Sequence, residues 1–285
     1  MMIILFTQYL YFFLFTCFLI GLAIGSFLNV VIYRLPIMLQ NAWRGECCEL
    51  LQLENKKNNP INLALPHSFC PHCQNKLRSW HNIPVISYLF LKGKCAFCKT
   101  PITWRYPLIE LMTGLVTLFI ASYYGISGQS CAIMLFTWCL IALTFIDFEH
   151  QLLPDIITLP LLWVGLLLNI SGTFTTLPAA VIGAVAGYLS LWSVAKLYEL
   201  ATGKAGMGYG DFKLLALIGA WLGWQILPLI VLLASLLGSI VGISLIIFKK
   251  HDRHIPISFG PYLAIAGWLG LLFNNELPKI YGWLI

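Results

Sequence analysis

The sequence predicts an all-α polytopic membrane protein of about eight transmembrane helices, with a small zinc-binding cytosolic domain between spans one and two. Three observations indicate this fold class: composition, apolar runs and a cysteine quartet. Hydrophobic residues make up 59% of the 285 residues and charged residues only 10%. Because a soluble protein carries about 25% charged residues, this composition excludes an ordinary soluble domain.

The apolar residues gather into runs long enough to predict membrane helices. Residues 9–33 form the first run, which has no preceding lysine or arginine and exceeds the roughly 7–15 residues of a cleavable signal. We therefore expect a retained first span. Seven further runs follow, at residues 106–124, 130–146, 156–170, 177–198, 212–223, 226–248 and 259–273. Several are shorter than the roughly 20 residues that cross a bilayer core, so seven or nine spans stay possible.

The basic residues predict the orientation, because lysine and arginine concentrate in cytosolic loops. Ten of the 17 lie within residues 34–105, three lie within 196–213 and three within 249–253. In an eight-span chain these regions share one side, and only Lys279 lies opposite. We expect a cytosolic large loop and both termini outside. The net charge of +6 follows the same rule, and no nucleic-acid motif accompanies it.

The large loop contains the pairs "CPHC" and "CAFC", in the arrangement C-x2-C-x21-C-x2-C. Four thiolates at such a spacing favour tetrahedral Zn²⁺, although the spacer slightly exceeds the usual ribbon range. A closed four-thiolate site is structural rather than catalytic. A redox or unliganded thiol pair is the alternative. The expected ligands are Cys70, Cys73, Cys95 and Cys98.

Two aspartates at the edges of apolar runs form the candidate catalytic pair. "GYGDFK" places Asp211 beside a strongly apolar segment, and "FIDFEHQLLPD" places Asp147 at the end of another. The predicted orientation puts both on the cytosolic side. Two carboxyl groups that share a proton can act as general base and general acid. The sequence therefore indicates an aspartyl hydrolase.

Structural roles compete with this interpretation at each acid. Asp211 could cap its helix, but a cap does not explain the glycines before it. Gly208 and Gly210 permit positive φ and close backbone approach, so an extended peptide could lie against them. Asp147 fits a cap poorly, because negative charge is unfavourable at a helix C-terminus. Asp155 lies at a good N-cap position and is expected to be structural.

The chain resembles the type IV prepilin peptidases, the bifunctional leader peptidase and N-methyltransferase enzymes of bacterial pilus and type II secretion systems. The resemblance runs nearly end to end. It rests on the cysteine quartet and on "GSFLNVVIYRLP", "IPVISYLFLKGKC", "RYPLIELMTG", "IDFEHQLLPD" and "GYGDFKL", beginning at residues 25, 83, 105, 146 and 208. It implies that Asp147 and Asp211 are catalytic.

The resemblance also implies the substrates. Prepilins and pseudopilins carry a short basic leader before an apolar helix, and cleavage typically falls between Gly and Phe at the cytosolic membrane boundary. The new N-terminal amine is then methylated with S-adenosylmethionine in the bacterial inner membrane. No Rossmann-type fingerprint is present, so the donor site is unconventional. Arg34 and Glu110 are candidates for it, equally readable as snorkelling or positioning residues.

These observations predict three regions: a first span over residues 1–33, a zinc-binding and methyltransferase-associated cytosolic region over 34–104, and a membrane-embedded aspartyl peptidase region over 105–285. Two other function classes compete. A proton-coupled transporter would use membrane acids as an ion relay, and a zinc-dependent scaffold would need the cysteines alone. Membrane lipid is an expected partner, and no motif specifies an oligomeric state.

Overall fold

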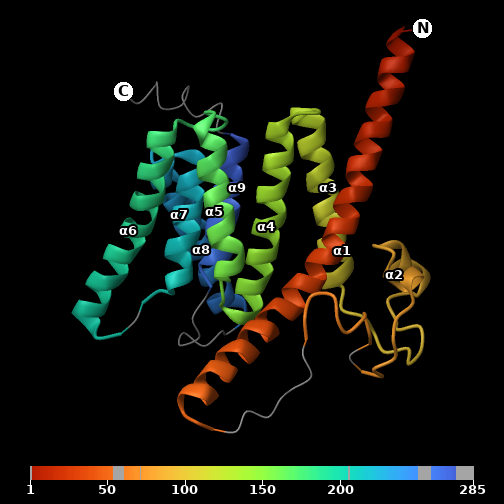
Figure 1. The fold of residues 1–285 in the computed structure, drawn as a ribbon, viewed down its shortest axis with the longest axis horizontal. Coiled ribbons are helices and arrows are strands. Elements are labelled where there is room, and N and C mark those ends of the chain that lie inside the picture. The colour runs from red at the N-terminus through yellow and green to blue at the C-terminus, as the bar shows by residue number, and fades with distance from the viewer. Residues whose placement is uncertain (1, 54–60, 71, 205, 250–257, 274–285) are drawn as a thin grey trace. The chain divides into compact units, whose positions relative to one another are not determined.

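A computed structural model describes residues 2–53, 61–70, 72–204, 206–249 and 258–273 of the chain (Figure 1). These residues are helical apart from a mainly non-helical segment between residues 51 and 104, short loops elsewhere and two isolated β-bridges. The elements are α1 (Met2–Leu50), the 3₁₀ turn η1 (Ser79–Asn82), α2 (Ile86–Phe90), α3 (Arg105–Tyr124), α4 (Gly128–His150), α5 (Asp155–Ile170), α6 (Leu177–Thr202), α7 (Tyr209–Leu222), α8 (Leu227–Lys249) and α9 (Gly260–Leu272).

The predicted helical membrane fold is confirmed. Each of the eight apolar runs coincides with one helix, α1 or one of α3 to α9. Within the described residues, five helices are long and apolar enough to cross a membrane: α1, α3, α4, α6 and α8. Helices α5 and α9 are apolar but shorter, as the short runs predicted. The chain is a multi-pass membrane protein.

Helix α1 is longer than the predicted first span. It continues past residue 33 to Leu50 and contains Pro36. The segment around Cys47 and Cys48 forms the last turns of this helix and is largely exposed. The first basic residue marks the edge of an apolar run, whereas a helix continues wherever good helix formers such as Met, Leu, Gln and Arg follow.

By packing, the chain divides into two compact units, Met1–Trp138 and Cys139–Ile285, and the boundary falls within α4. In the first unit α1 packs along α3. A Cβ atom on Gly21 would lie 2.8 Å from the Cα of Gly114, and one on Gly25 would lie 2.7 Å from the Cα of Glu110. These glycines let the two backbones approach closely, as small residues do between membrane helices.

Helix α7 is the core of the second unit and packs against α5, α6 and α9 (Figure 1). Every residue from Asp211 to Leu222 is buried except Lys213. The indole N–H of Trp221 donates to the carbonyl of Leu161 at 2.8 Å. Asn169, near the end of α5, donates to the carbonyls of Ala220 and Trp221 at 2.9 and 3.0 Å. A helix that is apolar on all sides is therefore enclosed by its neighbours.

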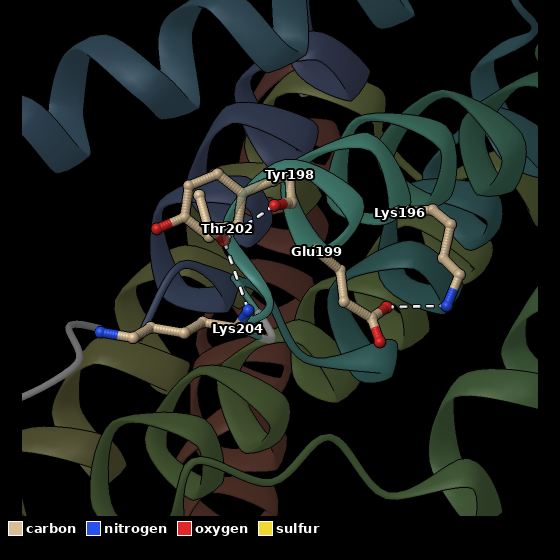
Figure 2. Close-up of polar contacts among 5 residues, drawn as sticks. All are labelled: Lys196, Tyr198, Glu199, Thr202 and Lys204. Atoms are coloured by element: carbon tan, nitrogen blue, oxygen red, sulfur yellow. Dashed lines mark hydrogen bonds and ion pairs between the residues drawn. The ribbon is translucent and has the colours of Figure 1, made fainter.

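Polar contacts terminate α6 before the glycine segment that leads to α7 (Figure 2). Lys196 pairs with Glu199 at 2.8 Å, and the Thr202 hydroxyl donates to the carbonyl of Tyr198 at 2.8 Å. The Thr202 hydroxyl also accepts from the amide of Lys204 at 3.3 Å. Gly203 closes the helix with φ +71°, a left-handed conformation that glycine adopts at low cost.

The contact between α6 and α7 predicts a strong size limit at Gly183. A Cβ atom there would collide with the carbonyl of Gly219, and a Cβ on Gly219 would collide with that of Gly183. Gly183→Leu is expected to destabilise the protein by about 1–3 kcal/mol or more, because overpacking forces backbones apart. Scanning fluorimetry of the detergent-solubilised protein should show a lower Tm.

Gly128→Ala is the matched control, because no atom lies within 4 Å of a Cβ at Gly128. Equal melting temperatures for Gly183→Leu and the unmodified protein would contradict the tight packing of α6 on α7.

Candidate active site and metal centre

The two predicted aspartates are both buried in the second unit. Asp147 lies in the last turn of α4 and is 6% exposed, and Asp211 lies in the first turn of α7 and is 8% exposed. The charge of Asp147 acts on the carboxyl group of Asp211, so the two groups are electrostatically coupled. Two carboxyl groups separated by 64 positions of sequence therefore share one buried region.

Leu153, in the connection between α4 and α5, brings the two acid-bearing helix ends together. A Cβ atom on Gly210 would lie 2.8 Å from the Cβ of Leu153, and one on Gly260 would lie 3.3 Å from its Cδ1. A Cβ on Gly260 would also collide with a carboxylate oxygen of Asp147. The first turns of α7 and α9 thus converge on the end of α4.

The two carboxyl groups have different hydrogen-bond partners. The Ser258 hydroxyl donates to the Oδ2 atom of Asp147 and lies 3.2 Å from its main-chain carbonyl. The amide of Gly260, the first residue of α9, also donates to the Asp147 carboxylate. Among the described residues, the carboxyl group of Asp211 has no such donor. Because an ionised carboxylate only accepts hydrogen bonds, these donors favour a negative charge on Asp147.

Sequence reasoning missed Ser258. It lies just before α9, and 111 positions separate it from Asp147 in the chain. Its segment carried only a charge signal, from the basic residues between 249 and 253. Nothing in the local spacing identifies a serine hydroxyl as the partner of a distant carboxylate.

The glycines before Asp211 do not adopt the positive φ that was expected. Gly208 has φ −78° and occupies the N-cap of α7, and Gly210 lies within its first turn. Glycine is required at position 210 because the backbone there lies close to the side chain of Leu153. No atom lies within 4 Å of a Cβ at Gly208, so one side of that backbone is open. Positioning of a substrate backbone by Gly208 and Gly210 stays a prediction.

Asp155 has a different structural role from the expected N-cap. Pro154 occupies the N-cap position, and Asp155 is the first residue of α5. Both carboxylate oxygens of Asp155 lie 2.7 Å from the Nζ atom of Lys213. This exposed ion pair joins α5 to α7 two residues after Asp211, and such pairs stabilise by only about 0–1 kcal/mol.

The four predicted cysteine ligands meet in the loop between α1 and α3. Their sulfur atoms all lie within 4.8 Å of one another, and the sulfurs of Cys70 and Cys98 are 3.8 Å apart. A tetrahedral zinc with Zn–S bonds of about 2.3 Å requires sulfurs about 3.8 Å apart. The geometry fits a closed four-thiolate metal site.

Two loops of the same geometry supply these ligands. The amide of Cys70 donates to the carbonyl of Asn75 at 3.1 Å, and the amide of Cys95 donates to that of Thr100 at 2.9 Å. The residue after the second cysteine has positive φ in both loops, +55° at Gln74 and +60° at Lys99. One β-bridge closes each loop, Phe69 with Lys76 and Lys94 with Pro101. The repeated geometry orients two sulfurs from each loop toward one centre.

One of the four thiols is shifted toward the thiolate form. The Thr100 hydroxyl lies 3.3 Å from the sulfur of Cys98 and lowers the pKa of that thiol to about 6. Metal binding requires deprotonated cysteine. The same cluster raises the pKa of the Cys73 thiol to about 11, so the four thiols are not uniformly ionised before a metal binds.

Arg34 and Glu110, the candidates for the donor site, line a cavity of about 310 Å³ in the first unit. Arg34 is buried, which excludes a snorkelling role, and its guanidinium donates to the carbonyls of Asn62, Leu63 and Pro66 at 3.0, 3.2 and 2.7 Å. Arg34 therefore positions the loop. Glu110 accepts from the amide of Val85 at 2.7 Å.

Comparison with known proteins gives a consistent result over most of the chain. The model of the bacterial peptidase A24 N-terminal domain matches residues 19–124, and that of the type IV leader peptidase family matches residues 134–243. The chain is 53% identical to a prepilin leader peptidase/N-methyltransferase of Stutzerimonas stutzeri, over 92% of this chain and 91% of the relative.

Relatives with the same description include one from Pseudomonas aeruginosa, 53% identical over 92% of this chain and 91% of its own. Another, from Neisseria gonorrhoeae, is 47% identical over 93% of this chain and 92% of the relative. No solved structure matches the chain.

The cysteine geometry predicts one bound metal ion per chain. Elemental analysis of the purified protein should find one zinc, and Cys73→Ser should lose it because a four-ligand site then lacks one thiolate. Cys131→Ser is the control, since Cys131 lies exposed on α4 and should not affect the metal content. A Cys73→Ser protein with full zinc content would rule out this ligand set.

Proposed function

The chain belongs to the type IV prepilin peptidase family, and from this premise we propose that Asp147 and Asp211 are the catalytic pair that removes prepilin leaders. The resemblance expected from the sequence is confirmed. The enzyme is a leader peptidase and N-methyltransferase, and its peptidase model matches residues that include both aspartates. The assignment of roles to residues rests on the geometry of the second unit.

The unequal environment of the two buried acids carries the proposal. Asp147 has two hydrogen-bond donors and holds the negative charge, whereas Asp211 lies beside that charge and keeps a proton. Like charges in a buried site do not both ionise readily. Asp147 therefore acts as general base and Asp211 as general acid.

Hydrolysis then follows in two balanced steps. Asp147 takes a proton from water as the water oxygen bonds to the scissile carbonyl carbon, and Asp211 gives its proton to the carbonyl oxygen. The tetrahedral intermediate collapses as its C–N bond breaks. The leaving nitrogen takes the proton from Asp147, and a hydroxyl of the intermediate returns one to Asp211. Both acids regain their starting states.

The order of the helices supports cleavage at one membrane face. Asp147 lies at the end of α4 and Asp211 at the start of α7, with two helices between them. Two intervening spans return the chain to the side it left. The basic residues favour the cytosol for this side, with both termini outside the bacterial inner membrane. The substrates are then prepilins and pseudopilins, cut between the basic leader and the apolar helix, typically between Gly and Phe.

The first unit carries the second activity in this proposal. The new N-terminal amine would form a bond to the methyl carbon of S-adenosylmethionine as the bond from that carbon to the sulfonium sulfur breaks, which leaves S-adenosylhomocysteine and releases the amine proton to solvent. Zinc at Cys70, Cys73, Cys95 and Cys98 holds two loops together and offers no open position for chemistry. A proton-coupled transporter requires acids deep within the spans, whereas Asp147 and Asp211 occupy terminal turns of their helices.

Replacing either aspartate should abolish cleavage. Asp147→Asn and Asp211→Asn keep the side-chain shape, but the first removes the general base and the second removes the general acid. The cleavage rate should therefore fall roughly 10²–10⁴-fold. Mass spectrometry of a co-expressed prepilin measures leader removal. Glu149→Gln, an exposed acid two residues after Asp147, is the control and should cleave normally. Normal cleavage by either Asn variant would disprove the catalytic pair.

Ser258 should position Asp147 without reacting itself. Ser258→Ala removes a hydrogen bond to a charged group, and a loss of about 1.4 kcal/mol would lower kcat about tenfold. KM should change little, and Ser258→Thr should restore much of kcat by returning a hydroxyl. Steady-state kinetics with a purified prepilin separate the two constants. An effect on KM alone would assign Ser258 to substrate binding instead.

A further inference from the structure

The cavity of the first unit is enclosed by elements that are distant in sequence. Its lining comes from α1, η1, α2, α3 and both cysteine loops, and all of it lies between Ser26 and Glu110. A volume of about 310 Å³ is at the lower end of the range of small-molecule sites, roughly 300–1,000 Å³. None of its lining residues belongs to the peptidase centre described above.

Asn29 presents an unsatisfied acceptor in this cavity. The side chain is only 5% exposed, and its Nδ2 atom donates to the carbonyl of Tyr106 at 3.1 Å. That bond fixes the orientation of the amide, because a carbonyl can only accept. The Oδ1 atom is buried and has no partner among the described residues. Buried polar atoms are normally paired, so this oxygen calls for a ligand that donates.

Glu110 supplies a second acceptor to the cavity lining. Its Oε2 atom accepts from the amide of Val85, and Ser26 donates to the same carboxylate. Val85 has φ +60°, a strained conformation for a β-branched residue. Backbone strain of this kind persists where the surroundings enforce it and is concentrated at ligand sites. Arg34 does not neutralise Glu110 in the described contacts, because it binds the carbonyls of residues 62–66.

Aromatic side chains complete the lining. Tyr33, Tyr88 and Tyr106 all border the cavity. The face of an aromatic ring attracts a cation. A pocket with two acceptor groups and several such rings suits a cationic ligand that also carries N–H donors and a flat ring system.

We propose that this cavity binds the methyl donor, with Asn29 and Glu110 accepting hydrogen bonds from its amino groups. The inference rests on the proposed methyltransferase activity, which requires a donor with a sulfonium, an ammonium and an adenine ring. Arg34 is a positioning residue for the cavity wall. Cys70 and Cys95 also border the cavity, so the metal site holds this wall in shape.

Direct binding tests the proposal without relying on turnover. S-Adenosylhomocysteine, which keeps the ammonium and the adenine ring but cannot transfer a methyl group, is titrated into the purified full-length protein by calorimetry. Glu110→Gln retains an acceptor for Val85 but loses the charge, and Asn29→Leu removes the unsatisfied oxygen. Each change should weaken binding at least about tenfold, the size expected for loss of a buried polar contact.

Glu49→Gln is the matched control, because it removes an exposed acid from the end of α1, away from the cavity lining. Prepilin cleavage by each variant shows that the protein is folded. Unchanged affinity in both Glu110→Gln and Asn29→Leu would overturn the proposal.

Two further outcomes separate the possible failures. If the unmodified protein binds no S-adenosylhomocysteine and adds no methyl mass to cleaved pilin, the methyltransferase assignment itself fails. A peptide with the mature pilin N-terminus, titrated in parallel, tests the other cationic substrate. If the variants lose affinity for this peptide but not for S-adenosylhomocysteine, the cavity holds the acceptor amine and the proposal is wrong.

Discussion

The free-energy cost of burying a carboxylate determines how the helices of the second unit pack around Asp147. An ionised acid within a membrane helix costs at least about 2.5 kcal/mol unless other groups compensate for it. Asp147 is compensated by the Ser258 hydroxyl and by the first amide of α9. Both donors are in place only if α9 begins beside the end of α4, and the absence of a side chain at Gly260 permits this. The packing of α9 against the end of α4 therefore supplies the two hydrogen-bond donors that stabilise a negative charge on Asp147.

The second unit and the cysteine loop of the first unit are held together by different means, because their compositions differ. The second encloses an apolar helix, α7, and its close packing depends on glycines that face backbone, such as Gly183 and Gly219. The cysteine loop is too polar to build a large hydrophobic core. Repeated hydrogen-bonded turns and four converging sulfurs replace that core, as metal sites do in other small domains.

Features set by local pattern were predictable from the sequence, and those set by distant contacts were not. Apolar runs predicted eight helices, and cysteine spacing predicted which sulfurs meet, because both depend on neighbouring residues. The hydrogen bond from Ser258 to Asp147, the pairing of Asp155 with Lys213 and the unsatisfied oxygen of Asn29 depend on tertiary packing. No spacing rule connects residues 58 or 111 positions apart. The proposed catalytic pair follows from the chemistry of acids at membrane edges and from the family resemblance.

The two proposed sites offer opposite electrostatic environments, which supports assigning the two reactions to different units. Hydrolysis needs one proton shared by two acids, so no permanent cation can neutralise the pair. In the proposed donor cavity, a carboxylate, an amide oxygen and aromatic rings suit a cationic donor. A single pocket serving both would place the sulfonium beside Asp147 and favour ionisation of Asp211, removing the proton that hydrolysis requires. Separate sites allow each charge arrangement to persist while the product of the first reaction becomes the substrate of the second.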